Sequence, residues 1–162
     1  MSDCWVIVAD GARARFMTVE RLAEVPERAA VRLAESARLS NPLHTVGGRR
    51  ALRKIKSGRD TGRGRIAPHG YTDKREPHEL EILRRFAARI AGRARALIAA
   101  DKAASMVLVA DPRMLGLLRT ALKPVCKERV KLREFAHDFT WCTTAQLQRR
   151  LARSGLLPAN KG

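Results

Sequence analysis

The chain has 162 residues and a mass of 18.0 kDa, a length that suits one domain burying about two-thirds of the surface of its unfolded form. Hydrophobic residues make up 45% of it but only seven residues are aromatic, so aliphatic side chains must fill the core and a stacking platform for nucleobases is not expected. Thirty-three Lys and Arg against sixteen Asp and Glu give a net charge of +17, which indicates a polyanionic partner. These values exclude a collagen-like chain, a coiled coil, a wholly disordered chain and a membrane-spanning protein.

The cysteines indicate a reducing compartment. Cys4, Cys126 and Cys142 are too few and too scattered for a disulfide framework, and none belongs to a CxxC pair. The apolar run over residues 4–9 is too short for a signal peptide, and Asp3 stands where such a peptide would carry basic residues. We therefore expect a cytoplasmic protein without a membrane span.

Three strands are expected in the first forty residues. The continuous apolar run 4–9 predicts a strand buried on both faces, which Asp10 and Gly11 bring to an end. Residues 12–19 alternate between two faces and predict a second strand, paired with the first through the Asp-Gly turn. A weaker alternation over residues 29–36 predicts a third strand, although its Ala and Glu content also suits a helix.

A long helix is expected over residues 77–100, because apolar side chains recur three and four residues apart from Leu80 to Leu97. The remaining elements are a strand over 106–110, a helix from Asp111-Pro112 to about Leu122, a strand over 130–135, and a helix over 146–153 capped by Thr143 or Thr144. This order predicts a single α/β domain over residues 1–162, with a central mixed sheet flanked by helices.

Residues 41–75 differ from the rest of the chain, because glycine and proline interrupt them and apolar periodicity is absent. We expect a mobile loop, inserted before the long helix. Residues 46–75 hold ten Lys or Arg and two Asp, a net charge of +8. Guanidinium groups and the backbone N–H groups of glycines can approach phosphates closely, so the loop is a candidate for polyanion binding. The alternative is a solvated loop whose charge only keeps the chain soluble.

The candidate nucleic-acid-binding residues lie in this loop and on the outer face of the long helix. They carry no motif that reads bases, so any binding is expected to depend weakly on sequence. In the loop they are Gly47, Gly48, Arg49, Arg50, Arg53, Lys54, Lys56, Arg59, Arg63, Arg65 and His69; on the helix they are Arg85 and Arg89, beside Arg84, Arg93 and Arg95.

Three aspartates are the best candidates for enzyme chemistry. Asp10, Asp111 and Asp138 stand at or near the ends of predicted strands, where converging carboxylates can hold Mg²⁺ for hydrolysis. The alternative is structural, with Asp10 starting a turn, Asp111 capping a helix and Asp138 capping the turn into the last helix. The sequence contains no GxxxxGK[ST], HExxH or GxSxG motif, so we assign no catalytic residue, cofactor or metal.

Histidine, cysteine and tryptophan give weaker signals. None of His44, His69, His78 and His137 has metal-ligand spacing. Cys126, His137 and Cys142 would lack a fourth ligand, so a zinc site is not expected. Trp5 and Trp141 are expected to pack in or near the core.

Five stretches of the sequence stand out together: WVIVADGARARF, the HGY of the basic loop, EILRRFAARIAGRA, VLVADPRMLGLLRTAL and FAHDFTWCTTAQLQRRL. Over essentially the whole chain they resemble the bacterial host attachment family, required for attachment to host cells, and VADPRMLGLLRTAL followed by HDFT is the most specific part. Members of that family look like relatives of the middle domain of the class 1 translation termination factor of eukaryotes and archaea. The resemblance implies an α/β sandwich around a mixed sheet.

In the termination factor, a Gly-Gly-Gln loop precedes the long helix and reaches the peptidyl-transferase centre. Gly47-Gly48-Arg49 is similar in position, but arginine replaces the glutamine that the termination chemistry uses. The resemblance therefore implies a flexible cationic loop on a ribosome-associated fold, without peptidyl-tRNA hydrolysis. We expect a non-catalytic module that binds RNA or the ribosome. The alternatives are a metal-dependent hydrolase or nuclease at the strand-end aspartates, and an interaction protein acting in host attachment.

Overall fold

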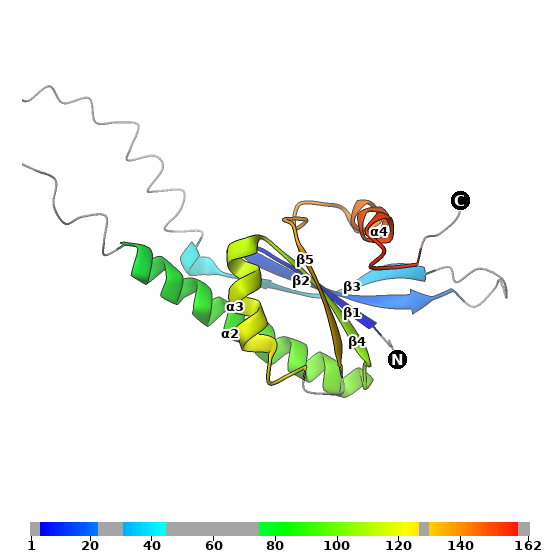
Figure 1. Ribbon diagram of the computed structural model, residues 1–162, viewed down its shortest axis with the longest axis horizontal. Helices are drawn as coiled ribbons and strands as arrows, with labels where there is room; N and C mark the ends of the chain where they lie inside the picture. The colour runs from blue at the N-terminus through cyan, green and yellow to red at the C-terminus, as the bar shows by residue number, and fades with distance from the viewer. Residues whose placement is uncertain (1–3, 23–30, 45–74, 127–129, 159–162) are drawn as a thin grey trace, which may run out of the picture.

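The structure is a computed structural model that describes residues 4–22, 31–44, 75–126 and 130–158. These residues form a five-stranded mixed sheet with helices on both faces (Figure 1), so the predicted α/β class is confirmed. The elements are β1 (Cys4–Ala9), β2 (Arg13–Arg21), β3 (Val31–Ser40), α2 (Arg75–Asp101), β4 (Ser105–Ala110), α3 (Pro112–Leu122), β5 (Lys131–Ala136) and α4 (Thr144–Arg153).

The sheet has the strand order β3-β2-β1-β4-β5. β1 runs antiparallel to β2 and parallel to β4, which in turn runs parallel to β5. Ala9 pairs with Ala110, and Ala110 pairs with Ala136, so the three parallel strands end in register. The residues that follow these strands therefore meet at one edge of the sheet, where open α/β sheets place ligands.

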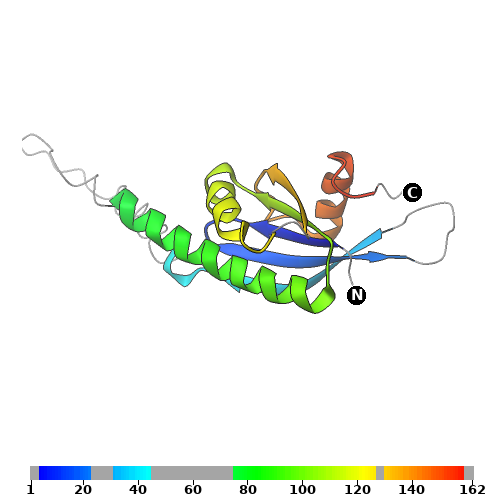
Figure 2. The same cartoon turned by 60° about the horizontal axis from the view of Figure 1, so that its bottom comes forward.

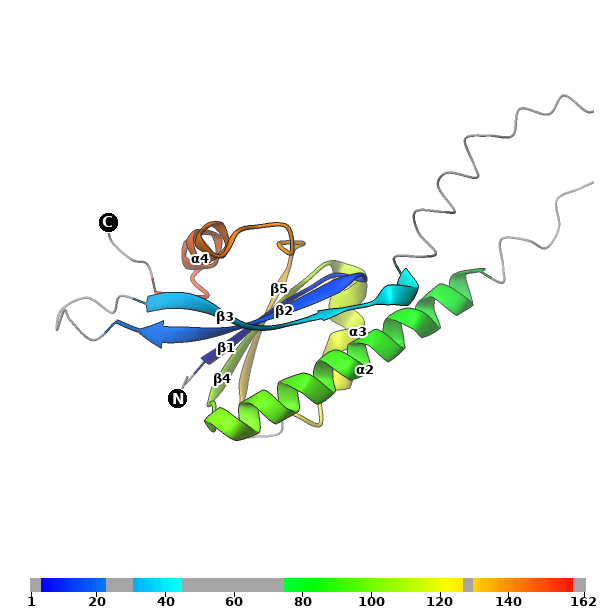
Figure 3. The same ribbon diagram turned by 180° about the vertical axis from the view of Figure 1, so that it is seen from behind.

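Two hydrophobic clusters lie on opposite faces of the sheet, because successive side chains of a strand point to opposite sides. Ile7 and Leu108 pack under α2 and α3, whereas Val8 and Val109 pack under α4. Figure 2 shows α2 running along the sheet, and Figure 3 shows α4 on the other side. Burial on both faces explains why β1 and β4 are continuous apolar runs.

The third strand extends further than predicted, over Val31–Ser40 instead of residues 29–36. Its length follows from pairing with β2, which holds Arg13 against Ser40 and includes a register shift between Phe16 and Met17. β3 is an edge strand, and Gln148 of α4 binds its outer backbone groups. The Gln148 Oε1 accepts from the N–H of Leu33 at 3.0 Å, and its Nε2 donates to the carbonyl of Val31 at 2.6 Å.

The first residue of the predicted loop, Asn41, is packed against the sheet, whereas the next three described residues are exposed. The side chain of Asn41 is buried, and its Nδ2 donates to the carbonyl of Gly11 at 2.9 Å. Its backbone N–H donates to the carbonyl of Ala12 at 2.8 Å, which fixes the chain after β3 against the β1–β2 turn. Residues 45–74, which contain the rest of the predicted loop, lie outside the described residues.

Ile90→Ala tests the packing of α2 on the sheet. Ile90 is fully buried, so we expect the free energy of unfolding to fall by about 3 kcal/mol through lost burial and a residual cavity. Arg93→Ala, on the exposed side of the same helix, is the control and is expected to change it by less than about 0.5 kcal/mol. Urea denaturation measures both variants, and equal effects would contradict this orientation of α2.

Candidate functional site

The outer face of α2 is cationic. The helix buries one stripe, including Leu83, Phe86 and Ile90, because apolar residues recur at helical spacing. The opposite side exposes five arginines: Arg84, Arg85, Arg89, Arg93 and Arg95. The predicted amphipathic pattern is therefore confirmed, including the outward position of the two helical candidates Arg85 and Arg89.

Few of these charges are neutralised by residues that the structure describes. The Arg85 Nε donates to Oε1 of Glu81 at 2.9 Å, and the Arg89 Nη1 donates to the carbonyl of Ser40 at 3.2 Å. Arg84, Arg93 and Arg95 form no ion pair with any residue that the structure describes. A positive surplus with this geometry attracts phosphates without selecting a sequence. The loop candidates from Gly47 to His69 lie outside the described residues.

Two of the three strand-end aspartates meet through a threonine. The Thr140 Oγ1 lies 2.7 Å from Oδ2 of Asp10 and 2.7 Å from Oδ1 of Asp138. The other Asp10 oxygen accepts from the backbone N–H groups of Ala12 and Arg13, both at 2.7 Å, as an aspartate at the start of a turn does. Asp10 and Asp138 thus tie the segment after β5 to the β1–β2 turn.

Asp111 has the structural role that the sequence left as one alternative. Its Oδ1 accepts from the backbone N–H groups of Arg113 and Met114, both at 3.1 Å, and so caps α3 in front of Pro112. Among the described residues, no group of three or more His, Cys, Asp or Glu side chains is arranged to hold a metal ion. The proposed convergence of three aspartates on one divalent ion is therefore not found there.

The cysteines and His137 have ordinary packing environments in the described part of the chain. The His137 ring stacks on Phe139, with centroids 4.9 Å apart, and Cys142 is buried. Burial, followed by the charge of Glu134, raises the pKa of the Cys126 thiol, which disfavours the reactive thiolate.

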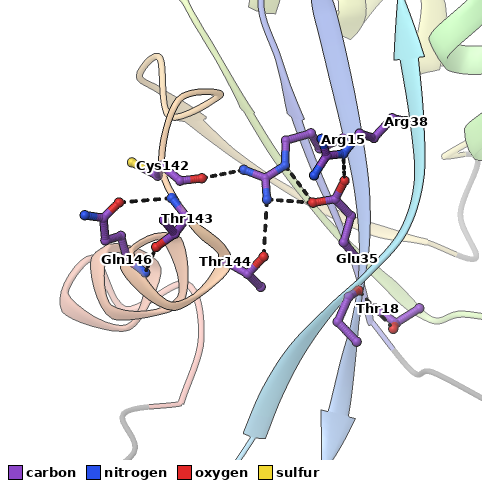
Figure 4. Close-up of polar contacts among 9 residues, drawn as sticks. Arg15, Thr18, Glu35, Arg38, Cys142, Thr143, Thr144 and Gln146 are labelled. Carbon is purple, nitrogen blue, oxygen red and sulfur yellow. Dashed lines mark hydrogen bonds and ion pairs between the residues drawn. The ribbon is translucent and has the colours of Figure 1, made fainter.

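A buried arginine joins three distant parts of the chain. Arg15 of β2 is 7% exposed, and its Nε and Nη2 donate to Oε2 of Glu35 in β3 at 2.9 and 2.7 Å. Its Nη1 donates to the carbonyl of Cys142 at 2.6 Å, and its Nη2 also approaches Oγ1 of Thr144 at 3.2 Å (Figure 4). All the donor nitrogens of the guanidinium are therefore satisfied, as a buried charge requires.

Glu35 neutralises two arginines. Arg15 and Arg38 stand directly opposite each other on β2 and β3, and like charges in that position destabilise a sheet. Glu35 binds both guanidinium groups. Burial by itself raises the pKa of Glu35, but the hydrogen bonds and charges of Arg38 and Arg15 outweigh it and leave that pKa below its ordinary value.

A pocket of about 570 Å³ opens beside this network, between β2, β3 and the start of α4. Arg13, Arg15 and Arg38 line it from the strands, and Trp141, Thr143 and Thr144 line it from the other side. The prediction that Trp141 packs in or near the core is wrong, because this residue is 59% exposed, whereas Trp5 is buried. Trp141 lies in a turn and not in a periodic element, so no sequence pattern indicated which way it faces.

Sequence reasoning missed this pocket, although part of its signal was visible. The alternation of β2 places Arg13 and Arg15 on the side opposite Phe16, and two arginines on one sheet face need anionic partners. Arg13 pairs with Asp10, whereas Arg15 pairs with Glu35, which lies in a strand whose register the sequence did not fix. The pocket also needs Thr143 and Thr144, which the sequence indicated only as helix caps.

The described residues define an α/β domain with a cationic face on α2 and an arginine-lined pocket beside α4. The family described as "Protein required for attachment to host cells" matches residues 5–151, and the chain belongs to that family. No curated protein matches the sequence. Among solved structures, one described as "Thermus thermophilus RuvC structure" is similar, with 9% sequence identity and a TM-score of 0.42. The alignment covers 98% of this chain and 83% of that one, and at this similarity it carries no inference about activity. Within the described residues, no helix is long and apolar enough to cross a membrane.

Acidification tests the network around Glu35. Because folding lowers the pKa of Glu35, its ion pairs stabilise the protein above the ordinary carboxyl pKa of 4.5, and this contribution is lost as the pH falls through the lowered value. We expect the free energy of unfolding of the wild type to decrease below about pH 4.5. In Glu35→Gln this decrease is expected to be smaller, and the free energy of unfolding at neutral pH is expected to be lower by about 2 kcal/mol. Urea titrations at several pH values measure the free energy of unfolding of each variant, with Glu79→Gln as the control. If the free energy of unfolding of Glu35→Gln depended on pH as that of the wild type does, Glu35 would not be the source of the acid sensitivity.

Asp111→Ala and Asp111→Asn distinguish a helix cap from a metal ligand. The alanine variant is expected to lower the free energy of unfolding by about 1 kcal/mol, because the cap oxygen is lost. The asparagine variant retains an acceptor and is expected to stay within a few tenths of a kcal/mol of the wild type. Thermal unfolding with and without Mg²⁺ measures both. A Mg²⁺-dependent stabilisation that both variants abolish would show that Asp111 is a ligand.

Proposed function

We propose that this member of the host attachment family is a non-catalytic module that binds RNA or the ribosome. The observation that carries the proposal is the outer face of α2, which exposes five arginines. Among the described residues, only one of these arginines, Arg85, forms an ion pair with an acidic side chain. Arg85, Arg89 and Arg93 follow each other at four-residue spacing, so they lie along one line of the helix. A row of cations on a straight element matches the regular spacing of phosphates along a nucleic-acid strand.

The basic segment 41–75 supports the same proposal through its charge. It precedes α2 directly, and residues 46–75 alone contribute a net charge of +8 from ten Lys or Arg and two Asp. The proposed kinship with the middle domain of the translation termination factor rests on sequence motifs, and Arg49 in the place of glutamine favours binding without hydrolysis. The family description concerns attachment to host cells and names neither a reaction nor a ligand.

Co-sedimentation with ribosomes and with free RNA over a range of salt concentrations tests the proposal. Six neutralised phosphates would give a slope of log affinity against log salt of about −4 to −5. Replacing Arg84, Arg93 and Arg95 with alanine removes charges that have no described ion-pair partner. We expect this triple variant to bind more weakly at every salt concentration and its slope to be shallower by about 2.

A charge-matched control distinguishes a binding site on α2 from general electrostatic attraction by the whole protein. Arg32, Arg149 and Arg153 are exposed on β3 and α4, and their replacement with alanine removes the same charge from elsewhere. The control is expected to bind almost as the wild type does. A second variant, with Arg49, Arg50, Arg53, Lys54 and Lys56 changed to alanine, measures the contribution of the basic segment. Binding that disappears near physiological salt, or equal losses in all three variants, would refute the proposal.

A further inference from the structure

We propose that the pocket between β2, β3 and the start of α4 binds a mononucleotide, with its phosphate held by arginines and its base placed against Trp141. The pocket lies on the α4 side of the sheet, opposite the face that α2 covers, because Arg13 and Arg15 alternate with Ala14 and Phe16. The inference is therefore independent of the cationic face of α2. The volume of about 570 Å³ falls within the range of small-molecule sites.

The strand wall offers guanidinium groups that retain donors. Three arginines and no carboxylate line the pocket. Arg15 is fully engaged, but Arg38 uses only its Nε on Glu35, and Arg13 uses only its Nε, 3.4 Å from Oδ2 of Asp10. The Nη groups of Arg13 and Arg38 form no hydrogen bond with any residue that the structure describes, and both side chains are more than half exposed. Arginines in this state bind phosphate with two parallel hydrogen bonds.

The opposite wall adds hydroxyl donors at a helix N-terminus. The Thr143 Oγ1 accepts from the N–H of Gln146 at 3.2 Å, and the Thr144 Oγ1 accepts from Arg15. Neither hydroxyl donates a hydrogen bond to any residue that the structure describes, so each hydroxyl proton is available for an acceptor in the pocket. α4 has no acidic residue in its first turn, so the positive end of its dipole faces the same space uncompensated.

Trp141 supplies a rigid aromatic surface for a planar ring. Its Nε1 donates to the carbonyl of Asp138 at 2.9 Å, and the guanidinium of Arg150 lies 5.2 Å from the ring centroid. These contacts fix the indole of Trp141, which lines the pocket and belongs to a residue that is 59% exposed overall. A fixed, exposed indole stacks on a base with little loss of entropy.

The two walls together explain why a nucleotide fits better than a bare anion. Asp10 and Glu35 stand behind the arginines, so the three guanidiniums and two carboxylates leave a net charge of +1 besides the helix dipole. That charge attracts one phosphate group moderately. The remaining volume and the indole then select a phosphate that carries a ring.

Binding of AMP to the full-length chain tests the inference, followed by calorimetry and by tryptophan fluorescence. Trp5 is buried and Trp141 is exposed, so a ligand-dependent change in fluorescence reports on Trp141. AMP is compared with adenosine and with inorganic phosphate, and we expect it to bind at least about tenfold more tightly than either. A 5′-phosphorylated RNA trinucleotide is titrated in parallel, because the 5′ end of an RNA carries the same phosphate and base as AMP. The ligand that binds more tightly shows whether the pocket takes a free mononucleotide or an RNA end.

The variants assign the two parts of the ligand. Arg13→Ala with Arg38→Ala is expected to weaken AMP binding by about tenfold or more, through lost charge-assisted hydrogen bonds. Trp141→Ala is expected to remove the preference for AMP over phosphate, and Trp141→Phe to retain part of it. Arg93→Ala with Arg95→Ala removes the same charge from α2 and is expected to bind AMP as the wild type does. Circular dichroism confirms folding of each variant.

Three results would overturn the inference. Phosphate binding as tightly as AMP would refute a role for the ring. An equal loss in the α2 control variant would reduce the binding to general electrostatic attraction. The absence of saturable binding by AMP and by the trinucleotide, with the fold intact, would refute a nucleotide site.

Discussion

The arrangement of α4 on the sheet depends on one buried charge. Removing the Arg15 guanidinium from water costs free energy, which only a complete set of partners offsets. One partner, Glu35, lies in β3, 20 residues away along the chain. The others, Cys142 and Thr144, lie at the start of α4, 127 and 129 residues away. Because the guanidinium is planar and its donors have fixed directions, it specifies position as well as affinity. Leu147 and Leu151 provide the apolar contact of α4 with the sheet, but apolar burial alone is not directional.

A second polar tie acts at the same edge of the sheet. Thr140 contacts Asp10 and Asp138, which attaches the segment after β5 to the turn after β1. With Arg15 holding Cys142 and Thr144, residues 138–144 are fixed at both ends. The pocket walls are therefore supported by hydrogen bonds to the sheet instead of standing on a free loop. A binding site built in this way loses little conformational entropy when a ligand enters.

The sequence predicted the elements whose signal is local and failed where pairing or packing decides. β1, β4 and the Asp111-Pro112 helix start were predicted correctly, because continuous apolar runs and a cap with proline are local patterns. The end of β3 was predicted too early, since its length depends on β2. The Arg15–Glu35 pair and the exposure of Trp141 depend on tertiary contacts, and no spacing in the chain encodes them. The residues of the predicted basic loop between 45 and 74 are not tested.

Two positively charged surfaces on opposite faces of the sheet differ in how their charge is balanced. Among the described residues, the exposed arginines of α2 have one acidic ion-pair partner, so their attraction for anions is long-ranged and strongly screened by salt. The arginines of the pocket have Glu35 and Asp10 behind them, so their net field is small and their effect depends on short, directed hydrogen bonds. This difference is why we propose a large polyanion of any sequence for the first surface and a small ligand of defined shape for the second. Binding to α2 should therefore weaken steeply with salt, and binding in the pocket should weaken only slightly, because one phosphate displaces few counterions.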